Sequence, residues 1–146
     1  MSITSQVMAA RVGAEPAVVC QVSSGWVVLA RMQYLHGYSI LMPDPVVPSL
    51  NVLAPAQRAA FLCDMALVGD ALLEVTGAYR INYAIMGNSD PVLHAHIVPR
   101  YQNEQDELRT GGPWSYSPKL VESMVFDPVH DYDLIQHLRA AIQKRL

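Results

Sequence analysis

A long helical pattern over residues 55 to 76 constrains the fold more than any other feature of the sequence. Pro55 stands where a proline is tolerated in the first turn of a helix, and Gly77 can adopt the left-handed conformation that often ends one. The apolar residues between them recur at steps of three and four, which places them on one face of the helix. They are Phe61, Met65, Val68, Leu72 and Val75. We therefore expect one long helix that buries this face in the core.

Five short apolar runs are typical of β-strands. They cover residues 17–23, 26–32, 38–43, 80–86 and 92–98. Small and polar residues at 23–25 suit a hairpin between the first two runs, and residues 87–91 suit a turn between the last two. Three prolines between residues 43 and 48 argue against regular structure before the long helix. These short connections predict an antiparallel sheet with helices on one face, which is an α+β fold.

The remaining segments flank this central pattern. Residues 3–12 suit a short helix, and a last helix is expected from near Asp131 to the C-terminus. Between the last strand and that helix, residues 101–129 read as a long irregular stretch, which in a compact domain is usually functional, interface-forming or disordered. A chain of 146 residues fits one domain with a single core, so we expect one domain over residues 1–146.

Composition and charge narrow the classes of partner. The chain is 51% hydrophobic and 16% charged, as globular proteins are, and its net charge of −3 argues against a nucleic-acid surface. No apolar stretch approaches the ~20 residues that span a bilayer, and the N-terminus lacks a secretory pattern. Cys20 and Cys63 match no metal or redox spacing and read as buried reduced thiols. We expect a cytoplasmic protein without a membrane or nucleic-acid partner.

The segment "DPVLHAHIVPRY", residues 90–101, places two histidines one residue apart in an apolar run. Side chains alternate between the faces of a strand, so His94 and His96 are expected side by side on one face. Two interpretations of this pair do not involve catalysis. Both histidines can make ordinary hydrogen bonds on a half-exposed face, or they can bind zinc or iron with a third ligand. His36, Asp44 and Asp90 are candidates for that third ligand.

A third interpretation is covalent catalysis. Neutral imidazole is a good nucleophile near pH 7 because its unperturbed pKa is about 6.5. It can attack a phosphorus atom, displace a leaving group and form a phosphoramidate that water cleaves. A second histidine and the N–H groups of an adjoining turn can hydrogen-bond the phosphate oxygens. Arg100 can neutralise negative charge on the phosphate or on the leaving group.

The segment "INYAIMGNSDPVLHAHIVPRY" resembles the signature of the histidine triad superfamily, and in particular its bacterial branch similar to diadenosine polyphosphate hydrolases. That branch shows Gly-Asn, a proline and then His-x-His-x-His-x-x-Pro-Arg. The resemblance covers about residues 25–101, with a C-terminal loop and helix over 102–146. It implies a five-stranded antiparallel sheet with one long and one C-terminal helix. It also implies a homodimer whose sheets join.

The resemblance implies a nucleotidyl hydrolase or transferase that acts on the α-phosphate of a purine nucleotide derivative. Diadenosine polyphosphates and nucleoside phosphoramidates are the substrate types. The middle histidine of the family is the nucleophile and falls on His94, while the third falls on His96 and contacts the phosphate. Asn88 falls on a phosphate-binding amide, Ser89 follows it in the same turn, and Asn82 matches a substrate-contacting asparagine.

The sequence departs from the family at two histidines. Val92 occupies the first position of the triad, and Val46 stands where an upstream histidine often follows the third strand. The family's histidines there help to orient the nucleophile, although a backbone carbonyl can accept the same N–H. A nucleotide-binding protein with impaired catalysis is therefore the main alternative. The covalent step requires no metal cofactor, and a divalent ion carried by a polyphosphate substrate is compatible with it. Trp114 and Tyr116 suit either base stacking or packing.

Overall fold

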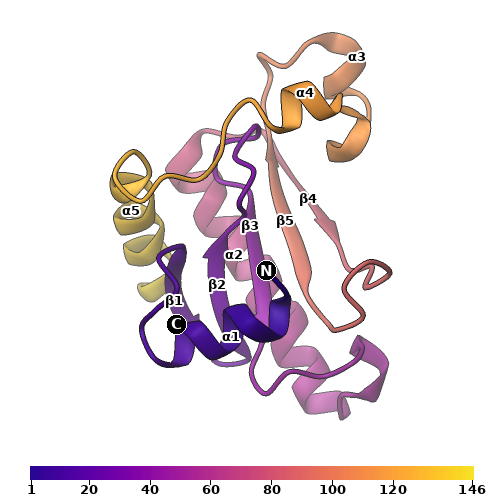
Figure 1. Ribbon diagram of the computed structural model, residues 1–146, viewed down its shortest axis with the longest axis vertical. Helices are drawn as coiled ribbons and strands as arrows, with labels where there is room; N and C mark the ends of the chain where they lie inside the picture. The colour runs from indigo at the N-terminus through magenta and orange to yellow at the C-terminus, as the bar shows by residue number, and fades with distance from the viewer.

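The computed structural model of the protein describes residues 1–146 and contains one five-stranded antiparallel sheet (Figure 1). In spatial order the strands are β1 (Val18–Val22), β2 (Gly25–Leu29), β3 (Ser39–Pro43), β5 (Ala95–Arg100) and β4 (Arg80–Ala84). Every neighbouring pair is antiparallel. The expected α+β fold is confirmed, and the hairpin that joins β1 to β2 turns at residues 23–25 as predicted.

The long helix α2 (Pro55–Thr76) has the bounds that the sequence predicts, and Gly77 ends it with a φ of 73°. Phe61, Val68 and Leu72 of its apolar stripe are completely buried, while Met65 and Val75 are half-buried. The C-terminal helix α5 (Tyr132–Gln143) packs against α2 and β1. The main hydrophobic cluster joins residues of these two helices to residues of the sheet, and it also includes Ile3 and Val7 near the N-terminus.

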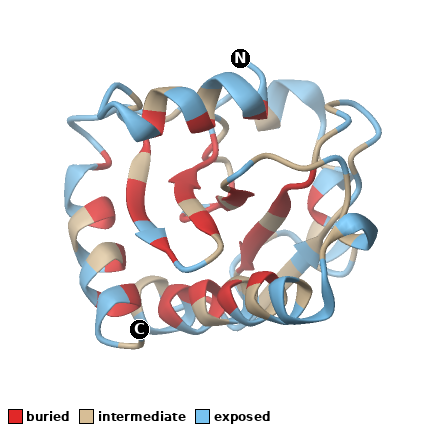
Figure 2. Cartoon of the chain, turned by 90° about the horizontal axis from the view of Figure 1, so that it is seen from below, coloured by how far each residue is buried: buried red, intermediate tan, exposed pale blue.

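The first helix, α1 (Ile3–Arg11), lies on the other side of the sheet from α2 (Figures 1 and 2). The expectation that all helices share one face is therefore wrong. Val7 of α1 is completely buried, so this helix covers part of the second face and protects apolar strand residues there. The opposite end of that face stays uncovered by α1. None of the helices combines the length and the apolar composition needed to cross a membrane.

The stretch between β5 and α5 is more regular than the sequence suggests. It contains α3 (Asp106–Arg109), a 3₁₀ turn η2 (Pro113–Ser115) and α4 (Pro118–Val121). A further 3₁₀ turn, η1 (Leu50–Val52), follows the proline-rich segment. Elements of three or four residues span about one helical turn and cannot repeat an apolar position, so hydrophobic periodicity cannot reveal them.

Two smaller expectations also need correction. Strand β5 begins at Ala95, so His94 and Val92 precede it, whereas the sequence predicted a strand from residue 92. Cys20 is buried as expected, and burial raises the pKa of its thiol to about 11. Cys63 is exposed on α2, although both cysteines were expected to be buried. A cysteine on an amphipathic helix takes the environment of its face, which its residue type does not determine.

Candidate active site

The two histidines lie side by side, as the sequence predicted. Their ring centroids are 4.9 Å apart, with the ring planes at 70° to each other. His96 lies in β5 between Ile40 of β3 and Ala84 of β4, and His94 directly precedes the strand. Both side chains belong to the sheet face that carries α1 rather than α2, because Ala95 and Ile97 point into the core.

A backbone hydrogen bond fixes the proton of His94. Its Nδ1 lies 2.9 Å from the carbonyl oxygen of Val92. A carbonyl can only accept, so in the neutral imidazole Nδ1 carries the proton and Nε2 keeps its lone pair. Val92, which the resemblance aligns with the first histidine of the triad, therefore orients His94 through its backbone carbonyl. The valine side chain has no polar atom that could do so. The sequence raised this possibility, and the hydrogen bond confirms it.

His96 is held as a neutral ring. Its Nδ1 is 2.7 Å from the hydroxyl of Tyr38, and its ring stands edge-on to Trp114 at 5.2 Å between centroids. Burial and the neighbouring His94 lower the pKa of His96 to about 4. Burial also raises the pKa of Tyr38, so its hydroxyl keeps its proton. Near pH 7 the imidazole of His96 is thus uncharged and has one N–H to donate.

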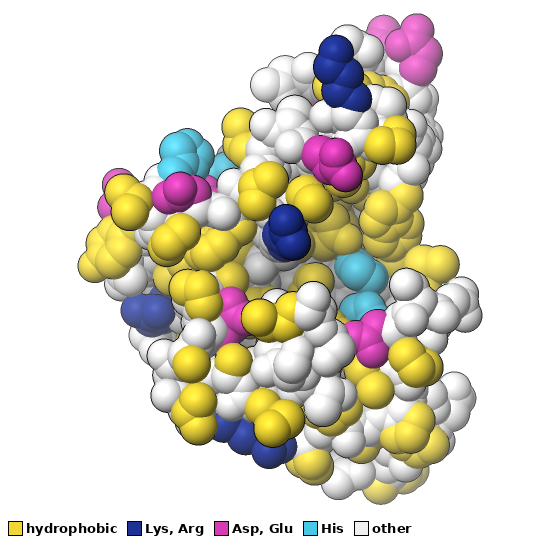
Figure 3. All heavy atoms as spheres, in the orientation of Figure 1, with side chains coloured by type: hydrophobic (Ala, Val, Ile, Leu, Met, Phe, Trp, Pro, Cys, Tyr) yellow, Lys and Arg dark blue, Asp and Glu magenta, His cyan; other side chains and the backbone are white.

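Two connected cavities open in front of the histidine pair. The larger, of about 680 Å³, runs between α1, the sheet face and residues 125–126. The smaller, of about 190 Å³, is lined by residues 86–90, both histidines and Trp114. Figure 3 shows adjacent histidine side chains (cyan) in a hollow of this face. Both predicted turn residues, Asn88 and Ser89, line the smaller cavity with His94. His94 is only 8% exposed, yet it lines both cavities.

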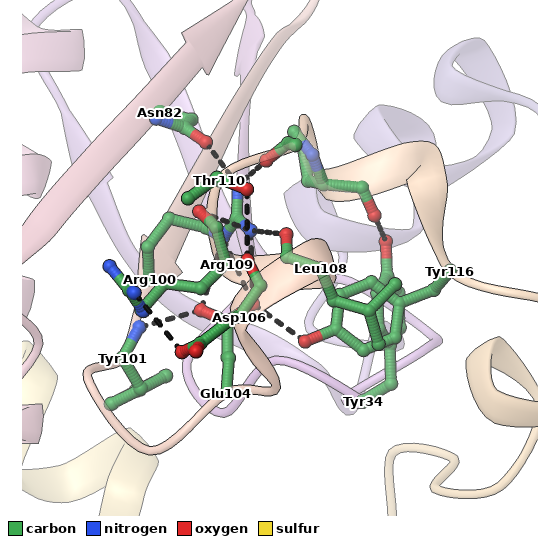
Figure 4. A network of polar contacts seen from close by, with 12 residues as sticks. Tyr34, Asn82, Arg100, Tyr101, Glu104, Asp106, Leu108, Arg109, Thr110 and Tyr116 are labelled. Carbon is green, nitrogen blue, oxygen red and sulfur yellow. Dashed lines mark hydrogen bonds and ion pairs between the residues drawn. The ribbon is translucent and has the colours of Figure 1, made fainter.

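The structure does not bring Arg100 or Asn82 to the histidines. Arg100 is 2% exposed, and its Nε and Nη2 donate to the carboxylate of Glu104 at 3.0–3.3 Å (Figure 4). Its Nη1 donates to Oδ1 of Asn82 at 2.7 Å and to the carbonyl oxygen of Gly111 at 2.8 Å. Arg100 thus forms a buried ion pair with Glu104, away from the histidines. Its role as a phosphate partner stays a prediction. Asn82 accepts a hydrogen bond from the same guanidinium and so helps to hold it in place.

The three candidates for a third metal ligand have other contacts. Asp44 accepts hydrogen bonds from Arg11 and from the indole of Trp26. Asp90 lines the cavities but accepts from the backbone N–H of Ile3 at 2.7 Å. His36 is exposed on the segment before β3. No group of three or more His, Cys, Asp or Glu side chains is arranged to hold a metal ion.

Tyr38 also belongs to the site, although it was not among the residues predicted from the sequence. Its ring and hydroxyl reach His96 because β3 pairs with β5, and that pairing joins segments far apart in the chain. No local pattern near residue 38 signals the contact. Trp114 was expected to stack or pack, and the structure places it on His96 and in the wall of the cavity. Tyr116 packs against Tyr34 instead and donates to Glu104.

Fold and site together define an α+β protein that presents two adjacent imidazoles, one with a fixed lone pair, to an open cavity. Comparison with protein-family models and with curated proteins finds no match. Comparison with solved structures does. A histidine triad protein from Marinobacter aquaeolei VT8 superimposes with a TM-score of 0.73 at 20% identity, covering 92% of this chain and 94% of its own.

Two further structures agree with this one. A hypothetical histidine triad nucleotide-binding protein from Sulfolobus tokodaii has a TM-score of 0.71 at 16% identity, covering 96% of this chain and 92% of its own. A zinc-bound histidine triad family protein from Mycobacterium smegmatis has a TM-score of 0.66 at 18% identity, covering 99% of this chain and 100% of its own. The chain has the fold of the histidine triad proteins.

Proposed function

We propose that this protein is a nucleotidyl hydrolase or transferase of the histidine triad family, and that His94 is its nucleophile. The observation that carries this proposal is the hydrogen bond from Nδ1 of His94 to the Val92 carbonyl, which leaves the Nε2 lone pair at the wall of an open cavity. An imidazole in this tautomer is ready to attack phosphorus without first losing a proton. The substrate is a purine nucleotide with a leaving group on its α-phosphate.

The reaction has two steps. Nε2 of His94 attacks the α-phosphorus, an N–P bond forms, and the bond from phosphorus to the leaving group breaks with its electron pair. A leaving polyphosphate departs as an oxyanion, and the amine of a phosphoramidate takes a proton from solvent as its bond to phosphorus breaks. The positive charge on the imidazole is stabilised by the Nδ1–H bond to Val92. Water then attacks phosphorus, the N–P bond breaks, and the water's protons go to solvent and the product phosphate. An acceptor other than water would make the same chemistry a transfer.

Neutral donors suit the phosphate. The uncharged His96 ring can donate its Nε2–H to a non-bridging oxygen when Tyr38 donates to Nδ1. Asn88 and Ser89 add an amide and a hydroxyl from the turn before His94. The larger cavity has the size of a ligand pocket and contains apolar residues suited to a purine, including Leu29, Ile40 and Phe126.

The test compares turnover by the wild type and a His94→Ala variant. Diadenosine tetraphosphate and adenosine phosphoramidate are the two substrates. We expect wild-type hydrolysis of at least one and a loss of about 10³-fold or more in the variant, because the covalent route is removed. A His137→Ala variant is the matched control, since His137 is exposed on α5. Equal turnover by wild type and His94→Ala refutes the nucleophile. Nucleotide binding without turnover by either protein supports the impaired-catalysis alternative suggested by Val92.

We also propose the homodimer that the resemblance implies, formed through the free edge of β4. The sheet has two edge strands, β1 and β4. Arg139 of α5 donates to the carbonyl oxygen of Val19 at 2.6 Å and so occupies part of the β1 edge. The β4 edge has no such cover and offers unpaired backbone groups. Sedimentation of the wild type and of a Tyr83→Pro variant tests the dimer. We expect a dimeric wild type and a monomeric variant that keeps the circular dichroism spectrum of the wild type, whereas a monomeric wild type contradicts the proposal.

The cytoplasmic location, the single domain over residues 1–146 and the absence of a required cofactor stay predictions. A divalent ion enters the proposal only as a companion of a polyphosphate substrate. The lining of the smaller cavity contains no lysine or arginine. Such an ion would therefore neutralise the negative charge of the phosphates there.

A further inference from the structure

We propose that Arg31 and Glu15 read the edge of the purine, so that the protein prefers guanine to adenine in the transferred nucleotide. Both residues line the larger cavity in front of the histidines. The inference rests on the proposed function and deepens it by naming the base. The two residues have no part in the chemistry at phosphorus, and adenosine compounds stay substrates with a lower kcat/KM.

Arg31 is an exposed cation without a partner inside the chain. The ion pairs that contain a lysine or an arginine involve Arg11, Arg100, Arg109, Lys144 and Arg145 instead. The backbone of Arg31 is nevertheless fixed, because its carbonyl oxygen accepts the N–H of Phe126 at 2.7 Å. A guanidinium without a partner, on a fixed backbone in the wall of a cavity, is available to a ligand.

Glu15 places the opposite charge at the same end of the cavity. It is half-buried, and its Oε1 accepts the N–H of Ala17 at 3.0 Å, while its Oε2 accepts no hydrogen bond from the chain. The carbonyl oxygen of Ala17 accepts the N–H of Leu29 at 3.0 Å, two residues before Arg31. These contacts bring Glu15 and Arg31 to the end of β2. The two side chains form no ion pair with each other, so each keeps polar atoms for a ligand.

This end of the cavity lies across the sheet from the histidines. His96 pairs with Ile40 of β3, and Ile40 pairs with Val28 of β2. The strand that leads to Arg31 is therefore two strand spacings, or about 10 Å, from the strand that carries His96. Ile40 lines the cavity between them. A nucleotide whose α-phosphate lies at the histidines thus extends its base toward Arg31 and Glu15.

The two charges match the hydrogen-bonding groups of guanine. Guanine presents two acceptors, O6 and N7, which a guanidinium can bind with two N–H groups. Its N1–H and its N2 amino group are donors, and they suit the unoccupied oxygen of a carboxylate. Adenine has an amino donor in place of O6 and an acceptor at N1. It would therefore place a donor against Arg31 and an acceptor against Glu15.

The first test measures the turnover of guanosine and adenosine 5′-phosphoramidate, which differ only in the base. We expect the wild type to favour the guanosine compound by about 10–100-fold in kcat/KM, because a good bidentate contact discriminates between bases by roughly this factor. Arg31→Met should remove most of this preference and change kcat/KM for the adenosine compound by no more than about twofold. Glu15→Gln, which keeps an oxygen for the N–H of Ala17, should also reduce the preference.

Lys119→Met is the matched control, since it removes one exposed positive charge from α4, outside the lining of the larger cavity. It should leave the preference for guanosine unchanged. Equal kcat/KM values for the two substrates in the wild type refute base recognition and leave the proposed hydrolase standing. An equal loss for both substrates in Arg31→Met, as a contact with phosphate or stacking on any base would give, also refutes it.

Equilibrium binding tests the inference without turnover. Isothermal titration calorimetry should give a dissociation constant about 10–100-fold lower for GMP than for AMP, and Arg31→Met should bring the two values close together. IMP has O6 but lacks the N2 amino group, so it should bind between the two. Equal binding of GMP and AMP overturns base recognition. Absence of turnover with a preserved preference for GMP overturns the hydrolase and supports base recognition.

Discussion

Replacing Glu104 with glutamine should destabilise the protein strongly. Arg100 and Glu104 form an ion pair whose side chains are 2% and 5% exposed, and the two groups share three contacts of 3.0–3.3 Å. The Glu104→Gln variant keeps the shape of the side chain but leaves the guanidinium buried without its counter-charge. Removing one partner of a buried pair costs about 3–5 kcal/mol of unfolding free energy.

Urea denaturation followed by circular dichroism measures this loss. With a slope of about 2 kcal/mol per molar urea, the midpoint should fall by about 1.5–2.5 M. The matched control is Asp106→Asn, which removes the same charge from a neighbouring pair in which Asp106 is 90% exposed. The control should leave the midpoint almost unchanged because solvent screens exposed pairs. Equal midpoints for the two variants would refute the buried ion pair of Arg100 and Glu104 as a major source of stability.

The same pair has a defined pH dependence. Burial raises the pKa of Glu104, but hydrogen bonds from Arg100, from the Tyr101 backbone and from Tyr116 outweigh it, so the pKa lies below its usual value. A carboxyl with a lowered folded pKa adds stability above its unfolded pKa of about 4.3 and loses it as pH falls through the folded value. The gap between wild type and Glu104→Gln should therefore be constant near neutral pH and close in acid.

Three further predictions concern single residues. The ring of His96 should titrate by NMR with a midpoint of about 4, and stability should fall as pH drops from about 6.5 toward that value, because the unfolded chain takes up the proton first. A midpoint near 6.5 would contradict its burial. Leu72→Ala should lower the unfolding free energy by about 2–5 kcal/mol, since Leu72 is completely buried. Gly77→Ala should cost roughly 1–2 kcal/mol because φ is 73° there. Chemical denaturation measures the unfolding free energy of both variants. An unchanged value would contradict the close packing of Leu72 or the left-handed conformation of Gly77.

Local signals explain why some elements were predictable from the sequence. Helix α2 begins at Pro55 and ends before Gly77, and each boundary depends on the conformational preference of one residue. The placement of Asn88 beside His94 was also predictable, since a short turn separates them in the chain. The side-by-side histidines follow from strand alternation. That arrangement holds although His94 lies one position before β5.

Long-range pairing explains why other features were not predictable. The contact between Tyr38 and His96 exists because β3 pairs with β5, and no local pattern encodes that neighbour. The environment of Arg100 depends on carbonyl oxygens of residues 108–111, which come together only when α3 forms. Glu104 stands four residues after Arg100 in the sequence, but no local pattern indicates that the arginine is buried.

Mass spectrometry of the stalled intermediate shows whether His94 forms a covalent bond to phosphorus. The wild type is mixed with diadenosine tetraphosphate, quenched at alkaline pH within one turnover, digested and mapped. We expect the peptide that contains His94 to gain the mass of one nucleotidyl group. Acid should remove this group, and the His94→Ala variant should lack it. Rapid turnover with the adduct on another residue, or turnover that survives in the His94→Ala variant, would refute His94 as the nucleophile.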